Sequence, residues 1–455
     1  MLTPNGLPAK QIEKLMLLSL WANKIKEEQE KNNGFRDKKF ILAGLGKPTY
    51  PVNSTTVAAY LDYWQQFTQT TNGPDPVSEQ AIDYGNPHGD LYPRTLMAES
   101  MTRWYQTRIH ADNILFTVGG VGALRVVFDT LNSYFSEIPG YRVLTPLPYH
   151  GVYATNPMHR LHPIPVMKTK GYQFTAATLK TSIQEAYSRA QIDGGLPKAL
   201  LMCNPSNPLG TVIPVEEMTR IAEVLRQYPE LYIIIDEAYI EMSYVPALSL
   251  LQLAPDLQPR MVVLRSATKA LSAAGERMAM LMAFCPKLTQ DMVYRNMSYF
   301  IHAPRSAQLA YAQTMMHFDA TEQQRLQTYY QKKVDYVQRR LIEMAAAMPD
   351  PDYRVQGAFY VLADLHELFG RPLPPKAQYI LQKGEAVTTD EELAYYLLVQ
   401  EHLMIAPLSY FGVSPQKGYM RITCSATEEE LCELMNRLEL QLSLQRKLKE
   451  TVQID

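Results

Sequence analysis

Short apolar runs alternate with longer amphipathic stretches through the middle of the chain. The runs contain few polar positions, which is typical of strands buried on both faces of a parallel sheet. The stretches between them, such as 122–137 and 214–230, carry apolar residues at helical spacing. This order predicts an α/β fold with a mostly parallel central sheet covered by helices. The predicted strands are NILFTV (113–118), RVLTP (142–146), HPIPVMK (162–168), KALLMC (198–203), LYIIID (231–236) and MVVLRS (261–266).

The two ends of the chain follow a different pattern. Residues 10–33 carry apolar side chains at helical spacing and predict a helix. A long helical stretch covers 321–348, and short strand candidates follow at 357–365 and 418–425. These later elements predict a smaller α+β domain. The proline-rich segment 367–390 is expected to be a surface insertion.

The composition excludes several classes of protein. The 455 residues are 46% hydrophobic with a net charge of −2. The chain therefore lacks the basic excess of a nucleic-acid-binding protein and the composition of a disordered one. Its apolar runs are shorter than the roughly 20 residues of a membrane span, and its first residues lack the pattern of a signal peptide. Four scattered cysteines without a C-x-x-C pair favour a reducing, cytoplasmic environment.

The segment RSATKALSAAGERMAM (265–280) contains the first candidate for chemistry. Lys269 lies where a buried strand meets a small-residue loop, an unusual place for a side chain that is normally solvated. Burial, or a neighbouring cation such as Arg277, lowers the pKa of a lysine and makes its amine a nucleophile that can form a Schiff base. An ordinary surface lysine is the alternative for this segment taken alone.

Two polar segments follow other predicted strands. Asp236 ends the most apolar run, and Tyr239 comes three residues later. A carboxylate at the carboxyl end of such a strand lies where ligands bind, and it could hold a pyridine nitrogen protonated. Asn207 lies in an Asn/Pro/Gly-rich loop, where its amide could donate to a ligand oxygen. A helix cap or a metal ligand is the alternative for Asp236, and a plain turn for Asn207.

Two further loops could hold a flat, charged ligand. FTVGGVGALRVVF (116–128) is a strand, a glycine loop and a helix, whose first backbone N–H groups could bind a phosphate. A tight packing turn is its alternative. LTPLPYHGVY (144–153) places His150 among tyrosines, and a ring there could stack on a planar cofactor. A partly buried aromatic loop is the alternative for this second segment.

Arg421 and Tyr84 complete the set of candidates. Arg421 lies inside a predicted strand, where a buried arginine needs a partner. Its planar fork suits a carboxylate ligand, and a structural ion pair is the alternative. Tyr84 lies in the glycine-rich turn of IDYGNPHGDLYPR (82–94), ahead of a predicted helix.

Together these residues resemble the class I/II aminotransferases, pyridoxal-phosphate enzymes of fold type I in the aspartate aminotransferase superfamily. The resemblance runs from about Lys39 to Thr427 and rests on the order of its motifs: glycine loop, aromatic loop, N-P-x-N-P-x-G, D-E-A-Y, S-x-x-K with arginine eight residues later, and a late strand arginine. It implies a large α/β domain at 52–325. It also implies a small α+β domain built from 326–455 and from 1–51, which holds the N-terminal helix and the substrate loop.

The resemblance implies pyridoxal 5′-phosphate as cofactor, an amino acid and a 2-oxo acid as substrates, a role in amino-acid metabolism, and no metal. Lys269 corresponds to the Schiff-base lysine, and Asp236 to the carboxylate that pairs with the pyridinium nitrogen. Asn207 and Tyr239 correspond to the partners of the cofactor's phenolic oxygen. In this family the amino acid displaces the lysine, and the freed Lys269 would then move the α-proton as general base and acid.

The resemblance also assigns the groups that hold anions. The backbone amides of Gly120 and Val121 would bind the cofactor's phosphate together with Ser266 and Arg277. Tyr84 would reach the phosphate of the neighbouring subunit's cofactor, which implies a homodimer with shared sites.

On the substrate side, Arg421 would bind the α-carboxylate, and the GLGKP loop with Gly46 would close over the substrate. Three departures from the family pattern matter, and one is the Ala-rich loop that follows Lys269 although Arg277 is kept. The glycine loop reads G-G-V-G-A-L-R, so Gly119 and Val121 offer only backbone N–H groups where relatives often have a hydroxyl or amide side chain. His150 stands where the family usually has Tyr, Trp or Phe, which leaves the type of reaction open.

Two alternatives to transamination follow. A decarboxylase, β-lyase or oxygen-using oxidase would keep the cofactor, and His150 is the main argument for these. A cofactor-sensing transcription regulator would need a DNA-binding domain of roughly 60–100 residues upstream, whereas about 38 residues precede the resemblance. Arg421 indicates only an α-carboxylate, so the substrate side chain stays open. A dicarboxylate would require a second cation, for which Lys47 and Arg305 are candidates.

Overall fold

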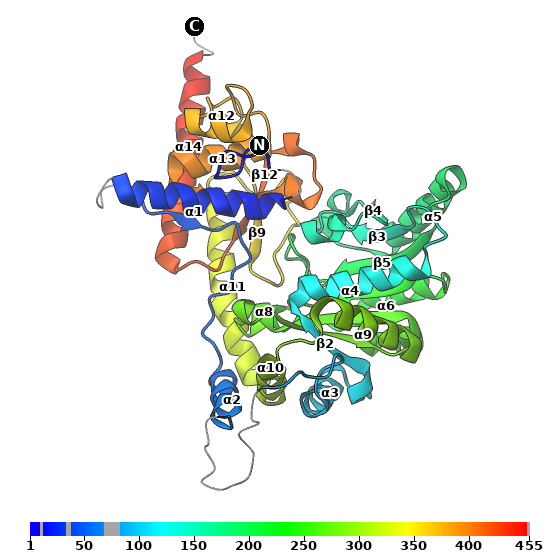
Figure 1. Ribbon diagram of the computed structural model, residues 1–455. Coiled ribbons are helices and arrows are strands. Elements are labelled where there is room, and N and C mark those ends of the chain that lie inside the picture. The colour runs from blue at the N-terminus through cyan, green and yellow to red at the C-terminus, as the bar shows by residue number, and fades with distance from the viewer. Residues whose placement is uncertain (10–11, 33–37, 68–81, 453–455) are drawn as a thin grey trace.

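The computed structural model describes residues 1–9, 12–32, 38–67 and 82–452 (Figure 1). Its main feature is a seven-stranded sheet in the order β2-β8-β7-β6-β5-β3-β4. The strands β3 to β7 pair in parallel, and β8 runs antiparallel to both of its neighbours. The predicted α/β class with a mostly parallel sheet is therefore confirmed. The strands are β2 (Ile114–Val118), β3 (Arg142–Pro146), β4 (Arg160–Ile164), β5 (Pro197–Cys203), β6 (Tyr232–Asp236), β7 (Met261–Ser266) and β8 (Met278–Ala283).

Helices cover both faces of this sheet, which explains why its strands are apolar at successive positions. In β6, Ile233 and Ile235 belong to one hydrophobic core, whereas Ile234 between them belongs to the other. Each strand residue must be apolar when both faces are packed. On one face lie α4 (Gly119–Tyr134) and α9 (Pro286–Phe300), and on the other lie α3 (Leu91–Tyr105), α5 (Ala176–Asp193) and α6 (Val215–Arg226).

The second part of the molecule combines the two ends of the chain. A three-stranded antiparallel sheet has the order β11-β12-β9, and β1 (Ile41–Leu42) pairs in parallel with β10 (Leu403–Met404). The helix α1 (Lys14–Asn32) packs on α13, and its Glu28 pairs with Lys376 of α12 (Figure 1). The other elements here are β9 (Tyr360–Asp364), β11 (Ala406–Pro407), β12 (Tyr419–Thr423), α11 (Ala320–Glu343), α12 (Pro375–Leu381), α13 (Asp390–Glu401) and α14 (Glu428–Val452).

The helix α11 links the two parts and extends continuously across the expected domain boundary at 325/326 (Figure 1). The division into 1–51, 52–325 and 326–455 stays a prediction.

The shorter helices that complete the described structure are α2 (Ser54–Gln65), α7 (Leu250–Leu253), α8 (Ala267–Ala270) and α10 (Arg305–His317). Within the described ranges, no helix has both the length and the apolar character that a membrane crossing requires.

Several expectations from the sequence need correction. The run 162–168 is not a strand throughout, because β4 ends at Ile164 and a 3-10 turn follows. The strand β8 was not predicted, although its six residues are all apolar, because it begins inside the candidate lysine segment 265–280. The segment 367–390 is not merely a surface insertion: it contains α12, whose Ile380 and Leu381 are buried in the core. The predicted helix 10–33 begins at Lys14, and residues 10, 11 and 33 lie outside the described residues.

Candidate active site

The carboxyl ends of β5, β6 and β7 and the first turn of α4 surround a cavity of about 170 Å³. This is the edge of an α/β sheet at which ligands bind. The structure brings nine of the twelve candidate residues to this cavity, two others lie against them, and Tyr84 lies apart. The lining candidates are Gly120, Val121, His150, Asn207, Asp236, Tyr239, Ser266, Lys269 and Arg277.

Lys269 extends into the cavity from α8, directly after β7. The hydroxyl of Ser266 caps this short helix by accepting from the backbone N–H of Thr268 at 3.2 Å. The lysine Nζ donates to the carbonyl oxygen of Gly46, so the predicted substrate loop lies against the predicted nucleophile. Burial lowers the pKa of Lys269 to about 8, with the positive charges of Arg421 and Arg277 adding to the effect. A larger share of the amine is thus neutral near physiological pH than in a solvated lysine.

Asp236 is the last residue of β6, and two hydrogen bonds hold its carboxylate. The Tyr153 hydroxyl donates to Oδ2 at 2.6 Å, and the backbone N–H of Ala238 donates to Oδ1 at 3.1 Å. Burial raises the pKa of Asp236, while these hydrogen bonds and the charge of Lys269 oppose the rise. The role of Tyr153 was missed because its partner is 83 residues away in the chain.

Arg421 is 2% exposed on β12 and contacts Asn207, which lines the cavity. Its Nη1 donates to the side-chain oxygen of Asn207 at 2.8 Å, and its Nη2 donates to the Gly44 carbonyl at 2.6 Å. Its Nε, which is buried, has no partner among the described residues. A buried guanidinium with an unpaired N–H is suited to an anionic ligand such as a carboxylate. The Asn207 amide nitrogen can still donate to a second ligand oxygen.

Two aromatic rings flank the Arg421 guanidinium, at 4.2 Å from the centroid of Tyr360 and 4.5 Å from that of Phe411. The Tyr360 hydroxyl is also 2.8 Å from the Tyr239 hydroxyl. Sequence reasoning missed Tyr360, since a tyrosine in the predicted strand 357–365 indicates only β structure. Its position two residues before the partner of Arg421 in the sheet becomes visible only from the strand register.

Another part of the cavity lining, around the first turn of α4, is suited to a phosphate. Gly120 and Val121 lie in the first turn of α4, where backbone N–H groups have no helical partner. Gly119 has a φ of 67°, and a Cβ there would lie 2.5 Å from Nη2 of Arg277. The absence of a side chain at this position therefore lets the guanidinium approach the helix terminus. With Ser266, these groups form a set of donors suited to an anion.

His150 borders the cavity beside Tyr153, with the two ring centroids 5.8 Å apart. Burial lowers the pKa of His150 to about 3, and the charges of Arg421 and Lys269 contribute. The imidazole is therefore neutral throughout the physiological pH range. It can present a flat face to a ligand without adding a charge.

The structure does not bring Tyr84 to the cavity. Its side chain is 77% exposed, and its ring meets His302 edge-on at 6.1 Å. Of the two candidates for a second substrate cation, Arg305 is engaged with Asp90 at 2.7 Å. Lys47 is exposed. Neither side chain lines the cavity.

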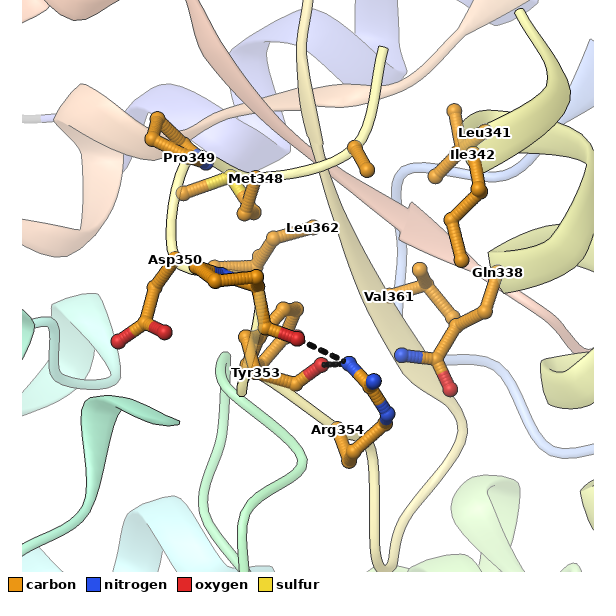
Figure 2. A pocket seen from close by; sticks show the side chains of 12 residues that line it. Gln338, Leu341, Ile342, Met348, Pro349, Asp350, Tyr353, Arg354, Val361 and Leu362 are labelled. Atoms are coloured by element: carbon orange, nitrogen blue, oxygen red, sulfur yellow. Dashed lines mark hydrogen bonds between the residues drawn. The ribbon is translucent and has the colours of Figure 1, made fainter. Parts of the chain in front are cut away.

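A larger cavity of about 420 Å³ lies elsewhere, between the end of α11, the following loop and β9 (Figure 2). Figure 2 shows Arg354 turned back on its own loop, where it donates to the carbonyls of Pro351 and Tyr353, each at 2.7 Å. This cavity is mostly apolar and contains none of the twelve candidates. Size alone therefore does not identify the functional site in this molecule.

The fold matches solved structures of aspartate aminotransferases. The enzyme from Rhizobium meliloti has a TM-score of 0.75 at 21% identity, over 96% of this chain and 97% of that one. The enzyme from Thermus thermophilus with maleate has a TM-score of 0.72 at 18% identity, over 95% and 97%. These likenesses establish the aspartate aminotransferase-like fold.

Sequence comparison identifies the family. Residues 75–438 match the model of aminotransferase class I and II, so the chain belongs to this family and the predicted resemblance is confirmed. A putative aminotransferase, YugH, of Bacillus subtilis (strain 168) is 26% identical over 75% of this chain and 80% of its own length. A probable aspartate/prephenate aminotransferase of Rickettsia felis is 24% identical over 80% and 85%. Aminotransferase activity is common to these names, and none of them favours a decarboxylase, β-lyase or oxidase.

Proposed function

We propose that this protein is a pyridoxal-phosphate-dependent aminotransferase that moves an amino group between an amino acid and a 2-oxo acid. The observation that carries the proposal is one cavity lined by a lysine amine of lowered pKa and a hydrogen-bonded carboxylate, with an arginine fork, which has an unpaired N–H, bound to the Asn207 side chain of the lining. These groups come from Lys269, Asp236 and Arg421. The amine suits the cofactor's aldehyde, the carboxylate suits its pyridine nitrogen, and the guanidinium suits the α-carboxylate of an amino acid.

The residues present fit pyridoxal phosphate. The first turn of α4, with Ser266 and Arg277, would hold the phosphate in the cradle that Gly119 leaves open. Asp236 would hold the pyridine nitrogen, and Asn207 and Tyr239 would donate to the phenolic oxygen. His150 would supply a neutral ring against the cofactor's face. When bound, the cofactor supplies an electron sink for charge that develops at the substrate's α-carbon.

The protein's own groups would then handle the substrate and its proton. Arg421 would bind the α-carboxylate, which orients the α-carbon within the cleft. Lys269, once released from the cofactor, would take the α-proton on Nζ and return it to another carbon. Its pKa of about 8 suits both directions of this transfer near neutral pH. The backbone of Gly46, in contact with Lys269, would limit the access of water.

A half-reaction tests the transfer itself. Adding an amino acid to the cofactor-loaded protein without an oxo acid should bleach the visible absorbance and release one equivalent of 2-oxo acid. A second oxo acid should restore the absorbance. Aspartate is the first donor to try, with glutamate, aromatic and apolar amino acids beside it, because several relatives are named for aspartate. Release of carbon dioxide or ammonia, or consumption of oxygen, without a matching 2-oxo acid would instead assign the decarboxylase, lyase or oxidase alternative.

We also propose that the protein acts as a homodimer in the cytoplasm. Large apolar side chains are exposed on α2, and α2 and α3 both pack on α10. Such a patch is typical of an interface. The Tyr84 segment is held to the same helix α10, because Arg305 donates to the Asp83 carbonyl at 3.3 Å, and from there Tyr84 would reach a neighbouring site. The free state of the four cysteines agrees with a reducing compartment. The exposed apolar residues are Val57, Leu61, Trp64, Leu91 and Tyr92.

Sedimentation velocity should show a species of twice the chain mass for the wild-type protein. Leu61→Glu, which places a charge in this patch, is expected to shift most of the protein to monomer at micromolar concentration and to weaken cofactor binding. Ile192→Glu is a matched control, because Ile192 is 88% exposed at the end of α5. A monomeric wild type, or an equal effect of both variants, would contradict the proposed interface.

A further inference from the structure

Tyr360 contacts several of the candidate residues, although no sequence motif marks it as part of the site. It is the first residue of β9 and is 1% exposed. In the antiparallel pair of β9 and β12, Tyr360 lies opposite Thr423, and Arg421 lies opposite Leu362. Tyr360 and Arg421 are therefore diagonal neighbours on one face of the sheet. This register places the ring 4.2 Å from the guanidinium, a cation–π contact.

Tyr360 contacts three residues with predicted roles in the site: Tyr239, Gly46 and Arg421. Its hydroxyl is 2.8 Å from the Tyr239 hydroxyl, across the boundary between the two parts of the molecule. It also lies against Gly46, where an added Cβ would be 2.2 Å from the Tyr360 oxygen and 3.1 Å from Nζ of Lys269. One phenol thus contacts the predicted substrate loop, the predicted carboxylate ligand and the predicted partner of the cofactor's phenolic oxygen.

Either hydroxyl can be the donor of the hydrogen bond between Tyr239 and Tyr360. Each phenol carries one proton, and burial raises the pKa of both Tyr239 and Tyr360, so both stay protonated. The charge of Arg421 opposes this rise in the pKa of both hydroxyls, and the Tyr360 ring lies against the Arg421 guanidinium. When Tyr360 donates and Tyr239 accepts, the bond has the direction that the proposed role of Tyr239 requires, because each phenol has one proton to give. The proton of Tyr239 is then free for another acceptor.

We propose that Tyr360 is a positioning residue: its hydroxyl donates to Tyr239 and thereby directs the Tyr239 proton into the cavity, toward the phenolic oxygen of the cofactor, while its ring supports Arg421. This inference rests on the proposed function. According to this proposal, the Tyr360 side chain on β9 affects both the ionisation of the cofactor, through Tyr239, and the position of Arg421, which would bind the carboxylate. Tyr360 itself acts only through Tyr239 and Arg421.

The variant Tyr360→Phe tests the hydroxyl while keeping the ring under Arg421. The visible absorbance of the lysine-bound cofactor changes with pH, and its apparent pKa should rise by about 0.5 to 1 in the variant, since one hydrogen bond to the deprotonated form is less well oriented. Tyr239→Phe, made in the other part of the molecule, should raise it in the same direction. The double variant should show little further change, because the two hydroxyls act as one unit. The KM for the amino acid should change less than about twofold.

Tyr353→Phe is the matched control. Its buried hydroxyl donates to the Leu209 carbonyl at 2.7 Å and lies outside the cavity, so its loss should lower thermal stability and leave the cofactor's titration unchanged. A Tyr360→Phe titration equal to that of the wild type, or additive shifts in the double variant, would overturn the proposal. A wild-type protein that forms no lysine-bound cofactor absorbance would instead overturn the proposed function.

Discussion

Replacing Lys269 by alanine is expected to abolish the visible absorbance of the protein with pyridoxal phosphate and to lower kcat by at least about 10³-fold. The amine would be both the covalent anchor of the cofactor and the group that moves the α-proton, and positioned acid–base catalysis alone contributes roughly 10²–10⁴-fold. Absorbance spectra with added cofactor and steady-state transamination measure the two effects separately. Cofactor should still bind through the phosphate-binding end of the cavity, which ultrafiltration of the variant with pyridoxal phosphate would show.

Lys180→Ala provides the control for this substitution, because Lys180 is an exposed lysine on α5. It should keep the wild-type spectrum and rate. The wild-type amine also predicts a pH effect: since only the neutral amine attacks, capture of added cofactor by the cofactor-free protein should accelerate as pH rises through about 8 and level off above it. An unchanged spectrum in Lys269→Ala would remove the basis of the assigned site.

Replacing Arg421 by alanine is expected to raise the KM for the amino-acid donor by roughly 10²-fold or more. Loss of one partner from a buried charged hydrogen-bonded pair typically costs about 2–5 kcal/mol. Since the guanidinium also binds Asn207 and Gly44 in the free protein, alanine should lower thermal stability too. Arg421→Lys retains the charge but not the planar fork, so it should fold better and still bind the carboxylate poorly.

Two controls separate carboxylate binding from a purely structural role. Arg437→Lys alters another buried arginine, whose Nη1 donates to the Lys39 and Glu401 carbonyls, and should cost stability without raising KM. A primary amine that lacks a carboxylate should react with the lysine-bound cofactor equally in wild-type and Arg421→Lys proteins. If the arginine variants reacted equally poorly with amines and amino acids, Arg421 would have only a structural role.

Much of the large sheet could be predicted from the sequence because both of its faces are buried. A run such as Ile233–Ile235 must be apolar at every position to satisfy two cores, and this leaves a visible pattern. The segment 367–390 shows the opposite case. Its prolines and polar residues resemble a surface loop, yet packing against the core buries Ile380 and Leu381. Local composition did not reveal that burial.

In the candidate site, too, some residues could be predicted from the sequence and others could not. Asp236 and Lys269 could be proposed from the chain order, because residues that end adjacent parallel strands emerge at the same edge of the sheet. Their assigned roles remain predictions that the experiments above test. The contacts of Arg421 could not be predicted in this way. They join Arg421 to Asn207 and Gly44, which are more than 200 positions away in the sequence.

The order of strands and motifs along the chain was thus sufficient to predict the class of fold, the family and a set of residues for one cavity. The contacts that orient those residues depend on how distant segments pack. Tyr153 meets Asp236 across 83 positions, Tyr360 meets Tyr239 across 121, and Arg421 meets Asn207 across 214. The spacing of apolar residues along one helix or strand shows which of its faces is buried, because that pattern lies within the element itself. A hydrogen bond between two elements requires both to be folded and docked, and therefore appears only in the tertiary structure.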